Sequence, residues 1–391
     1  MRFADRMYTT GKSFIREILK ATVNPEIISF AGGLPNPVSF PVDEIKKACS
    51  NVLENDGAAA LQYSTTEGYL PLREYIAARY KARHGIDADP SRILITTGSQ
   101  QAIDLLSKVF VNQGDDIIIE KPGYLGAIQS FSVFQPNFVT VPLKENGVDT
   151  DALQKAVENT NASLFYAVPN FQNPSGKTYS KETREKVAEI LKDTDIIFVE
   201  DDPYGELRFI GEDLPTMACY IPEQTILLGS FSKIISPSMR LGWIYAPSDE
   251  IYDKLVVAKQ ASDLHTNFFA QKVVHDYLAN NALDEHIAKI KALYKSQRQC
   301  MVESIEKYFP ENVSYTTPEG GMFIWVTLPD GMSSMKLFDI AIAKNVAFVP
   351  GVPFYVGEDD ANTFRLNYTN SDNEKIVEGI KRLGTAIKEL G

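Results

Sequence analysis

The sequence predicts an α/β fold in two parts: a large domain with a mainly parallel seven-stranded sheet flanked by helices, and a smaller α+β domain. Between about residues 90 and 250, short β-branched runs alternate with amphipathic helical patterns, which is typical of a largely parallel sheet. The last hundred residues instead begin with a long helical pattern followed by strand-like segments. A chain of 391 residues also exceeds one ordinary core, because about 150 residues per domain is usual.

Seven runs in the central region predict the strands of the large sheet. Each is short, rich in β-branched or aromatic residues, and separated from the next by a turn or a helical pattern. In chain order they are ILIT (93–96), DIIIE (116–120), NFVTVPL (137–143), SLFYAV (163–168), DIIFVED (195–201), TILLGS (225–230) and WIYA (243–246).

Helices are predicted between these strands by apolar residues that recur at helical spacing. Such spacing places the apolar side chains on one stripe that faces the core. In QQAIDLLSKVFVN the stripe is Ile103, Leu106, Val109 and Phe110, and in KETREKVAEILKD it is Val187, Ile190 and Leu191.

The two chain ends are predicted to form the smaller domain together. The N-terminal part contains the turn-rich segment FAGGLPNPVSFP. The C-terminal part has a helical pattern around 283–308, the strand-like segments GGMFIWVTLP, NVAFVPG and TFRLNYT, and an amphipathic helix near 372–389. We therefore expect a large domain over 46–282 and a small domain that combines 1–45 with 283–391.

Composition and charge exclude several classes of function. The net charge of −12 and the pI near 5.0 argue against a nucleic-acid partner, which requires a basic face. Cys49, Cys219 and Cys300 are widely separated and give neither a disulfide framework nor a zinc spacing. The first residues lack the apolar core of a signal peptide, and no stretch approaches the length of a membrane span. We therefore expect a cytoplasmic protein without a membrane partner.

Polar residues follow the predicted strands at their carboxyl ends, where open α/β sheets bind ligands. The turn TGSQQA after the first strand opens a helix, whose N-terminal N–H groups are suited to a phosphate. The side chains delivered by the strand ends are Ser99, Gln100, Tyr124, Asn173, Asp201, Tyr204, Ser230, Ser232 and Lys233. Each is weak evidence alone, but together they predict a site for a phosphate-bearing cofactor.

The segment GSFSKIISPSMRLGW (229–243) is the most informative part of this set. It places Lys233 among small hydroxyl residues and Arg240 seven positions later. Two other phosphate motifs are absent. PSGKT (174–178) ends like a nucleotide-hydrolase loop but has Phe171 where that motif requires glycine, and no GxGxxG follows a strand.

These motifs resemble those of the fold-type I pyridoxal-5′-phosphate aminotransferases, most closely the 2-aminoadipate and kynurenine aminotransferase subgroup. The resemblance covers nearly the whole chain and rests on SFAGGLPNP, LQYSTTEGYLPLRE, TTGSQQA, PGY, PNFQNPSG, EDDPYGELRF, GSFSKIISPSMRLGW, TPEGGMFIWV, VPGVPFY and TFRLNYT. It implies an aspartate-aminotransferase-like fold, pyridoxal 5′-phosphate (PLP) as the cofactor, and a homodimer with shared active sites.

The resemblance also implies a role for each site residue. Lys233 would form the Schiff base with PLP, and Asp201 would bond the pyridine nitrogen. Tyr204 and Asn173 would hold the ring hydroxyl, and Tyr124 would stack on the ring. The catalytic residues would then be Lys233, Asp201 and Tyr204, with no metal.

The remaining roles concern the phosphate and the substrate. The phosphate would be bound by Ser99, Gln100, Ser230, Ser232 and Arg240, with Tyr63 reaching it from the partner subunit. Arg365 would grip the substrate α-carboxylate, and the other substrate-binding residues would be Asn173, Gly33 and Arg16.

The chemistry of these side chains agrees with such roles. A lysine must lose its proton before it attacks a carbonyl, and partial burial near a cation lowers its pKa. The freed amine of Lys233 can then carry a proton between the substrate and the cofactor. An ionised Asp201 keeps the pyridine nitrogen protonated, which makes the ring an electron sink. Arg365 suits a bidentate grip on a carboxylate, whereas Asp202 is expected to be a structural cap.

We therefore expect an aminotransferase that moves an amino group between an L-amino acid and a 2-oxo acid such as 2-oxoglutarate. The donor would be aromatic, 2-aminoadipate-like or long aliphatic, with Phe14, Ile15, Leu34, Phe354 and Tyr355 as candidate pocket residues. Arg16 either meets a distal carboxylate or is a solvated residue of an amphipathic helix. A PLP-dependent β-lyase or decarboxylase remains an alternative. An effector domain of a transcription regulator is a weaker alternative, because the sequence pattern of the cofactor-binding fold begins within the first fifteen residues.

Overall fold

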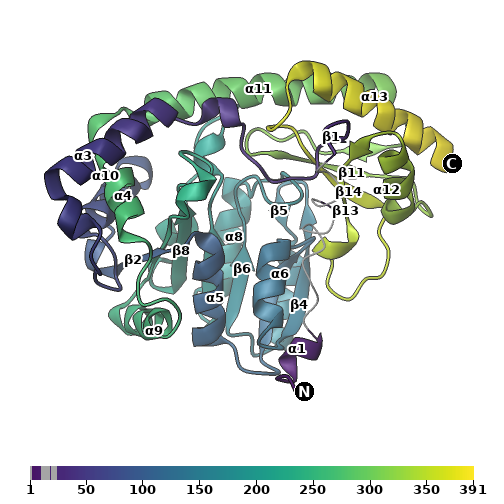
Figure 1. The fold of residues 1–391 in the computed structure, drawn as a ribbon. Helices are drawn as coiled ribbons and strands as arrows, with labels where there is room; N and C mark the ends of the chain where they lie inside the picture. Colours follow the sequence, from purple (N-terminus) through teal and green to yellow (C-terminus); the bar gives the residue numbers. More distant parts are fainter. Residues whose placement is uncertain (1, 10–17, 19–23) are drawn as a thin grey trace.

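The computed structural model describes residues 2–9, 18 and 24–391. An eight-stranded sheet lies at the centre of the molecule (Figure 1). In spatial order its strands are β2 (Ile93–Thr96), β9 (Gly242–Tyr245), β8 (Thr225–Ser230), β7 (Ile197–Asp201), β6 (Leu164–Ala167), β3 (Asp116–Lys121), β4 (Asn137–Lys144) and β5 (Gly147–Val148). The strands from β8 to β4 run parallel to one another, whereas β9 is antiparallel to β2 and β8.

All seven predicted strands are present, but the sheet has eight strands rather than seven. The additional strand β5 pairs antiparallel with the end of β4. It is only two residues long, so no alternation of apolar and polar residues could reveal it in the sequence.

Both faces of this sheet are covered by helices. Successive side chains of a strand point to opposite faces, and Ile117 and Ile119 of β3 join one apolar cluster while Ile118 joins another. The predicted stripes of α5 (Ser99–Phe110) and α8 (Lys181–Leu191) are confirmed, because their apolar residues pack into the first and the second cluster respectively. The other helices of this region are α3 (Val42–Ala60), α4 (Leu70–His84), α6 (Leu125–Ser132), α7 (Thr150–Asn159), α9 (Asp249–Gln260) and α10 (Phe268–Asn280).

A second, antiparallel sheet is built from the C-terminal part of the chain. Its order is β10 (Ser314–Tyr315), β11 (Phe323–Thr327), β14 (Thr363–Asn367) and β13 (Val349–Pro350). Close to it, β1 (Ile28–Ser29) pairs in parallel with β12 (Val346–Ala347), so residues from near both chain ends lie side by side. The short helix α1 (Arg6–Thr9) lies apart from this sheet, at the opposite end of the molecule (Figure 1).

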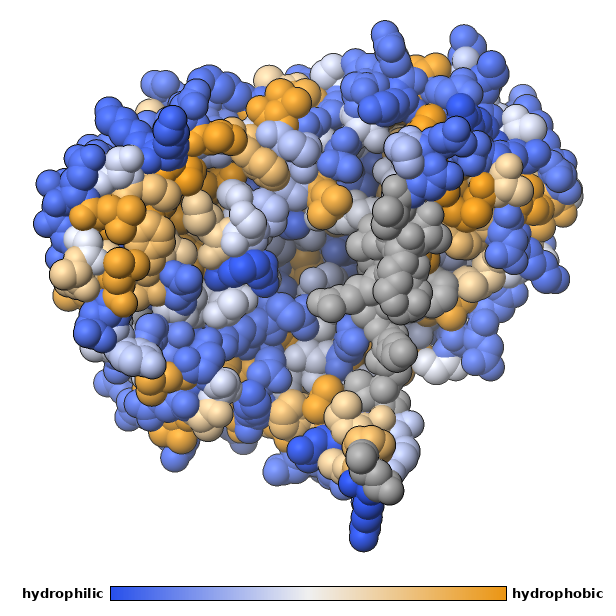
Figure 2. All heavy atoms as spheres, in the orientation of Figure 1, coloured by the Kyte–Doolittle hydropathy of each residue, from blue (hydrophilic) through white to orange (hydrophobic). Residues whose placement is uncertain are grey.

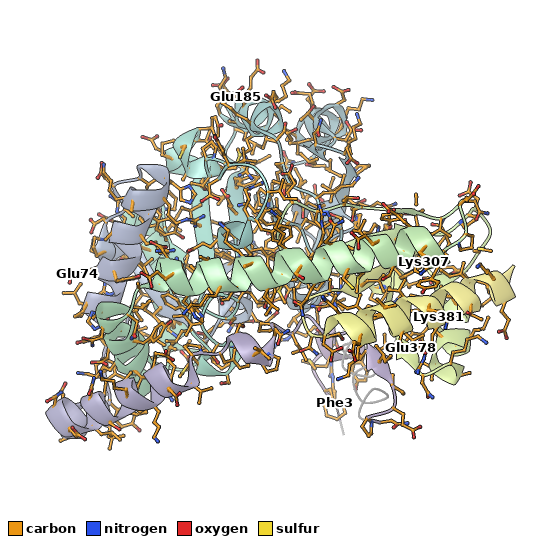
Figure 3. The ribbon with its side chains drawn as sticks, turned by 90° about the horizontal axis from the view of Figure 1, so that it is seen from above. Phe3, Glu74, Glu185, Lys307, Glu378 and Lys381 are labelled. Carbon is orange, nitrogen blue, oxygen red and sulfur yellow. The ribbon has the colours of Figure 1, made fainter. Side chains whose placement is uncertain are left out.

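Three helices pack around the second sheet, and one of them links the two parts. They are α11 (Leu283–Tyr308), α12 (Ser334–Ala343) and α13 (Asn373–Leu390). Seen from above, α11 crosses the molecule and lies beside α13 (Figure 3). Its 26 residues give a length of about 39 Å at 1.5 Å per residue.

Short 3₁₀ segments complete the described structure, and several of them end next to strands. They are Pro37–Ser39, Pro90–Arg92, Gly205–Leu207, Met217–Cys219, Pro222–Gln224, Pro237–Met239 and Val352–Phe354. Within the described part of the chain, none of the helices is long and apolar enough to cross a lipid bilayer.

Candidate active site

A cavity of about 360 Å³ lies at the carboxyl ends of the parallel strands, where α/β sheets bind ligands. The face of the molecule in Figure 2 is hollowed near its centre. The cavity is lined by Gly33, Ser99, Gln100, Tyr124, Val168, Asn173, Asp201, Pro203, Tyr204, Ser230, Ser232, Lys233, Pro237, Arg240 and Arg365. Segments that are far apart in the sequence therefore supply one site.

The structure brings together all but two of the predicted site residues. Tyr63 is 80 % exposed and lies outside this cavity, in a separate hollow where its ring meets the edge of His265. Arg16 lies outside the described residues. Of the predicted pocket residues, Phe14 and Ile15 also lie outside the described residues, and the remaining three do not line the cavity. These three are Leu34, Phe354 and Tyr355.

Lys233 lies three residues beyond the end of β8 and reaches across the cavity. Its Nζ donates a hydrogen bond to the carbonyl oxygen of Gly33 at 2.9 Å. Burial, together with the positive charges of Arg365 and Arg240, lowers the pKa of Lys233 to about 8. A fraction of this amine is therefore neutral near pH 7 to 8, which is the form that attacks a carbonyl.

Asp201 is the last residue of β7 and is almost completely buried. The hydroxyl of Tyr166 donates to its Oδ2 at 2.5 Å, while Oδ1 has no hydrogen-bond partner among the residues that the structure describes. Burial raises the pKa of Asp201 to about 7 against the opposing effect of the Tyr166 hydrogen bond. An unpartnered buried acceptor is costly, so Oδ1 is suited to a ligand that carries a proton.

Tyr166 was not among the predicted site residues. It lies inside the strand-like run SLFYAV, where an aromatic residue is expected to belong to the core, and it does pack on Phe131. Its contact with Asp201 depends on β6 and β7 being neighbours, with Tyr166 opposite Val199. That register is not visible in a single sequence.

Arg365 comes from β14 of the second sheet and is 2 % exposed. Its Nη1 donates to Asn173 Oδ1 at 2.8 Å, and its Nη2 donates to the carbonyl oxygen of Ala31 at 2.7 Å. The guanidinium lies over the Phe323 ring, 4.3 Å from its centroid. Burial lowers the pKa of Arg365 to about 10, so the side chain stays cationic at neutral pH and can hold a carboxylate.

Asn173 and Tyr204 form a pair between Arg365 and the sheet. Asn173 Nδ2 lies 3.4 Å from the Tyr204 hydroxyl, and both side chains are buried. Burial raises the pKa of Tyr204 above its ordinary value, and it also raises the pKa of Tyr124 to about 12. Both phenols are therefore neutral at physiological pH and can donate hydrogen bonds.

The N-terminus of α5 forms one end of the cavity. Its cap residue is Gly98, which has a φ of 74° and leaves the first N–H groups of the helix without a side-chain cap. A Cβ at position 98 would meet Arg240 Nη2 at 2.6 Å, so glycine permits the close approach of this arginine. Free helical N–H groups, serine hydroxyls and an arginine together suit a phosphate group.

A network behind this turn holds it in place. Gln101 Oε1 accepts from the backbone N–H of Thr97 and from Lys259 Nζ. Lys259 also donates to Asp263 and Thr266, and Asp263 accepts from Gln101. Lys259 is completely buried on α9, and neither it nor Asp263 was among the predicted site residues.

Asp202 has the structural role that was expected. Its Oδ1 accepts from the backbone N–H of Gly205 at 2.7 Å, at the start of a 3₁₀ turn. It does not line the cavity.

The donor set fits one kind of group. The cavity offers a phosphate cradle at one end, an unpartnered carboxylate oxygen for a protonated ring nitrogen, and an amine for an aldehyde. PLP carries all three functions, so the residues present fit this cofactor.

The model of the family "Aminotransferase class I and II" matches residues 28–383. The chain belongs to this family. It is a PLP-dependent aminotransferase, and the resemblance of its motifs to this class is confirmed.

Three proteins similar to this chain are aminotransferases with named substrates. An aromatic-amino-acid aminotransferase 1 from Thermococcus litoralis is 43% identical over 393 residues, which cover 99% of this chain and 94% of the relative. A 2-aminoadipate transaminase from Thermus thermophilus is 43% identical over 382 residues, which cover 97% and 94%. The crystal structure of a Pyrococcus horikoshii kynurenine aminotransferase in complex with PMP has a TM-score of 0.94 at 43% identity and covers 99% of this chain and 97% of the other.

Proposed function

We propose that this aminotransferase uses an L-amino acid with an aromatic, 2-aminoadipate-like or long aliphatic side chain as donor, and 2-oxoglutarate as acceptor. The activities of the three similar proteins support this choice. The observation that carries the proposal is that Lys233, Asp201 and Arg365 line one cavity of about 360 Å³. These residues supply an amine, a carboxylate and a carboxylate-binding cation to the same bound molecule.

Lys233 is the proposed proton carrier. When bound, PLP supplies a ring that withdraws electrons from the substrate α-carbon. The lysine amine, with its pKa lowered to about 8, would carry a proton between the α-carbon of the substrate and the C4′ carbon of the cofactor. Gly33, whose carbonyl oxygen accepts from Nζ, orients this amine.

Asp201, Asn173, Tyr204 and Tyr124 are proposed to orient the cofactor ring. Asp201 Oδ1 would accept from the ring nitrogen, and the charge of the carboxylate would keep that nitrogen protonated. Asn173 and Tyr204 would donate to the ring hydroxyl, and Tyr124 would stack on the ring face. Tyr204 is the third catalytic residue of the proposal because it holds the ring beside Lys233.

The phosphate and the substrate carboxylate are proposed to lie at opposite sides of Lys233. Ser99, Gln100, Ser230, Ser232 and Arg240 would bind the phosphate. Arg365, fixed by Asn173 and by the Ala31 carbonyl, would bind the α-carboxylate of every donor, and Gly33 would contact the substrate. The proposal for Arg16, a contact to a distal carboxylate, concerns a residue outside the described part.

A homodimer with shared active sites is the second part of the proposal. Figure 2 shows hydrophobic residues gathered over the region of α3 and α4. The exposed apolar side chains there include Leu53, Leu61, Tyr63 and Leu70. An exposed apolar patch of this kind is typical of an interface, and a two-fold interface would carry Tyr63 of one subunit to the phosphate of the other.

Two further expectations stay proposals. The division into a large domain over 46–282 and a small domain over 1–45 and 283–391 is supported by the pairing of β1 with β12. The cytoplasmic location is supported by the three cysteines, which are all free.

Product analysis tests the proposed reaction against its alternatives. The PLP-loaded enzyme is incubated with phenylalanine, 2-aminoadipate or leucine, with and without 2-oxoglutarate, and glutamate, the new 2-oxo acid, ammonia and carbon dioxide are measured. With the acceptor present, we expect glutamate and the 2-oxo acid in equal amounts over many turnovers. Without it, the 2-oxo acid should stop at one equivalent per active site and no glutamate should form. Ammonia formed without acceptor would indicate a β-lyase, and carbon dioxide would indicate a decarboxylase.

Arg16→Ala tests the proposed donor specificity in the half-reaction, in which the PLP-loaded enzyme is mixed with one amino acid without acceptor and its absorbance is followed. We expect this variant to lose more activity with glutamate or 2-aminoadipate than with phenylalanine. Equal losses for all donors would contradict a contact between Arg16 and the distal carboxylate.

A further inference from the structure

The two oxygens of the Asp201 carboxylate have different surroundings. Oδ2 accepts a hydrogen bond from the Tyr166 hydroxyl at 2.5 Å, and Oδ1 has no partner among the described residues. Both residues are 1 % exposed, and Asp201 lines the cavity. The carboxylate is therefore held at one oxygen and available at the other.

Tyr166 is itself fixed by its surroundings. It lies on β6, with its backbone paired to β3 and β7, and its ring packs edge-on against Phe131 with the centroids 5.8 Å apart. Burial, with the nearby negative charge of Asp201, raises the pKa of Tyr166 well above its ordinary value. The phenol therefore stays a hydrogen-bond donor over the whole physiological range of pH.

We propose that Tyr166 is a positioning residue for the cofactor: its hydroxyl holds Oδ2 of Asp201, so that Oδ1 is presented to the protonated ring nitrogen of PLP. The proposal rests on the role of Asp201 given above. Rotation of the carboxylate away from this orientation would break a charge-assisted hydrogen bond in a buried place, where such bonds are strongest.

The hydroxyl also favours the ionised form of Asp201. Desolvation raises the pKa of this carboxyl, the Tyr166 hydrogen bond lowers it, and the negative charge of Asp202 raises it. The other titratable groups near this pair are Glu120, whose charge acts on Tyr166, and Tyr124. Loss of the hydroxyl therefore leaves a carboxyl that is more often protonated and a poorer acceptor for the ring N–H.

The test compares two cofactors on the same protein. Tyr166→Phe keeps the ring on Phe131 and removes only the hydroxyl. Dissociation constants are measured by absorbance and tyrosine fluorescence for PLP and for the analogue in which C–H replaces the ring nitrogen. We expect the variant to bind PLP roughly tenfold more weakly, which is the size of one hydrogen bond to a charged group, and to bind the analogue as the wild type does.

Tyr179→Phe is the matched control. Tyr179 is also 1 % exposed and its hydroxyl donates to another buried carboxylate, Glu120, at 2.8 Å, but Glu120 does not line the cavity. We expect this variant to show the same ratio of the two dissociation constants as the wild type. Because the ratio is taken within one protein, a general loss of stability does not change it.

An unchanged ratio in Tyr166→Phe would overturn the proposal, whether both affinities fall together or neither falls. Asp201→Asn separates this failure from a failure of the role of Asp201. Asp201→Asn could weaken the binding of PLP more than that of the analogue while Tyr166→Phe does not. In that case Asp201 holds the ring nitrogen without help from Tyr166. If neither variant is selective, the role of Asp201 itself is wrong.

Discussion

At the scale of single residues, the cavity combines groups whose pKa values are shifted toward each other. Burial lowers the pKa of Lys233 to about 8 and raises that of Asp201 to about 7. An amine that titrates near neutral pH is suited to move protons. The positive charge of a protonated ring nitrogen would in turn favour the ionised form of Asp201. Arg365 stays charged beside them because its pKa falls only to about 10.

The lowered pKa of Lys233 predicts a dependence of stability on pH in the cofactor-free protein. Between about pH 8 and the ordinary value of 10.5, the unfolded chain keeps this proton while the folded chain has released it. The free energy of unfolding therefore rises with pH in this window, by at most about 1.4 kcal/mol per pH unit. Lys233→Met removes this contribution.

Urea unfolding at several pH values between 8 and 10 measures the effect as the difference between wild type and Lys233→Met. The other titrating groups are common to both proteins and cancel. We expect the wild type to gain stability relative to the variant as the pH rises. Parallel curves for the two proteins would contradict a lowered pKa for this lysine.

At the scale of elements, the site depends on turns that follow strands. The turn between β2 and α5 is the clearest case, because Gly98 starts the helix with a positive φ and Arg240 closes over it. The Lys259 amine makes three hydrogen bonds behind the turn, to Gln101, Asp263 and Thr266. The phosphate cradle is therefore shaped before any phosphate binds.

Lys259→Met is predicted to weaken the binding of PLP through its phosphate. The substitution keeps the volume of the side chain approximately and leaves Gln101 and Asp263 without their shared donor. We expect the dissociation constant of PLP to rise roughly tenfold, while that of pyridoxal, which lacks the phosphate, stays the same. Fluorescence titration of the cofactor-free protein with both compounds measures this.

Lys108→Met is the control for this prediction. Lys108 forms an ion pair with Asp104 on α5, four residues apart like Lys259 and Asp263. It is exposed, and its amine donates to Ser262 rather than to Gln101 or Asp263. We expect it to bind both compounds normally. Equal weakening of PLP and pyridoxal by Lys259→Met would mean that the network supports only the fold.

The strand ends explain how much of the site could be predicted from the sequence. Asp201 ends one apolar run and Lys233 comes three residues after another, so their place at the edge of the sheet is visible in the order of residues. Tyr166 was missed because it lies inside a strand, where the pattern predicts a core residue. Lys259 was missed because it lies inside a helix, where the pattern predicts a surface residue. The strand β5 was missed because two residues carry no periodicity.

At the scale of the whole molecule, the cavity is closed by parts that are distant in sequence. Gly33 and Ala31 come from near the N-terminus and Arg365 comes from β14 of the second sheet, while Asp201 comes from the central sheet. The substrate carboxylate and the cofactor would thus be held by different sheets. The periodicity of the sequence does not reveal that Arg365 and Asp201 share one cavity. This arrangement was expected only from the resemblance to the PLP-dependent aminotransferases.

Shared active sites predict that two inactive variants restore each other. Lys233→Ala removes the amine of its own site, and Tyr63→Ala would remove the phosphate contact of the partner's site. In a mixed dimer, one site would lose both groups and the other would keep both. We expect a mixture of the two variants, after dissociation and reassociation, to regain up to about a quarter of the wild-type activity if the subunits pair at random. Activity no higher than the sum of the separate variants would contradict a shared site.

The most direct test of the central claim is an absorbance titration of the PLP-loaded protein with single amino acids, in the absence of an acceptor. We predict that phenylalanine, 2-aminoadipate or leucine converts the absorbance band of the aldehyde form of the cofactor into that of the amine form, and that 2-oxoglutarate then restores it. A band that persists with every amino acid, or that returns without acceptor while ammonia is released, would contradict transamination by this chain.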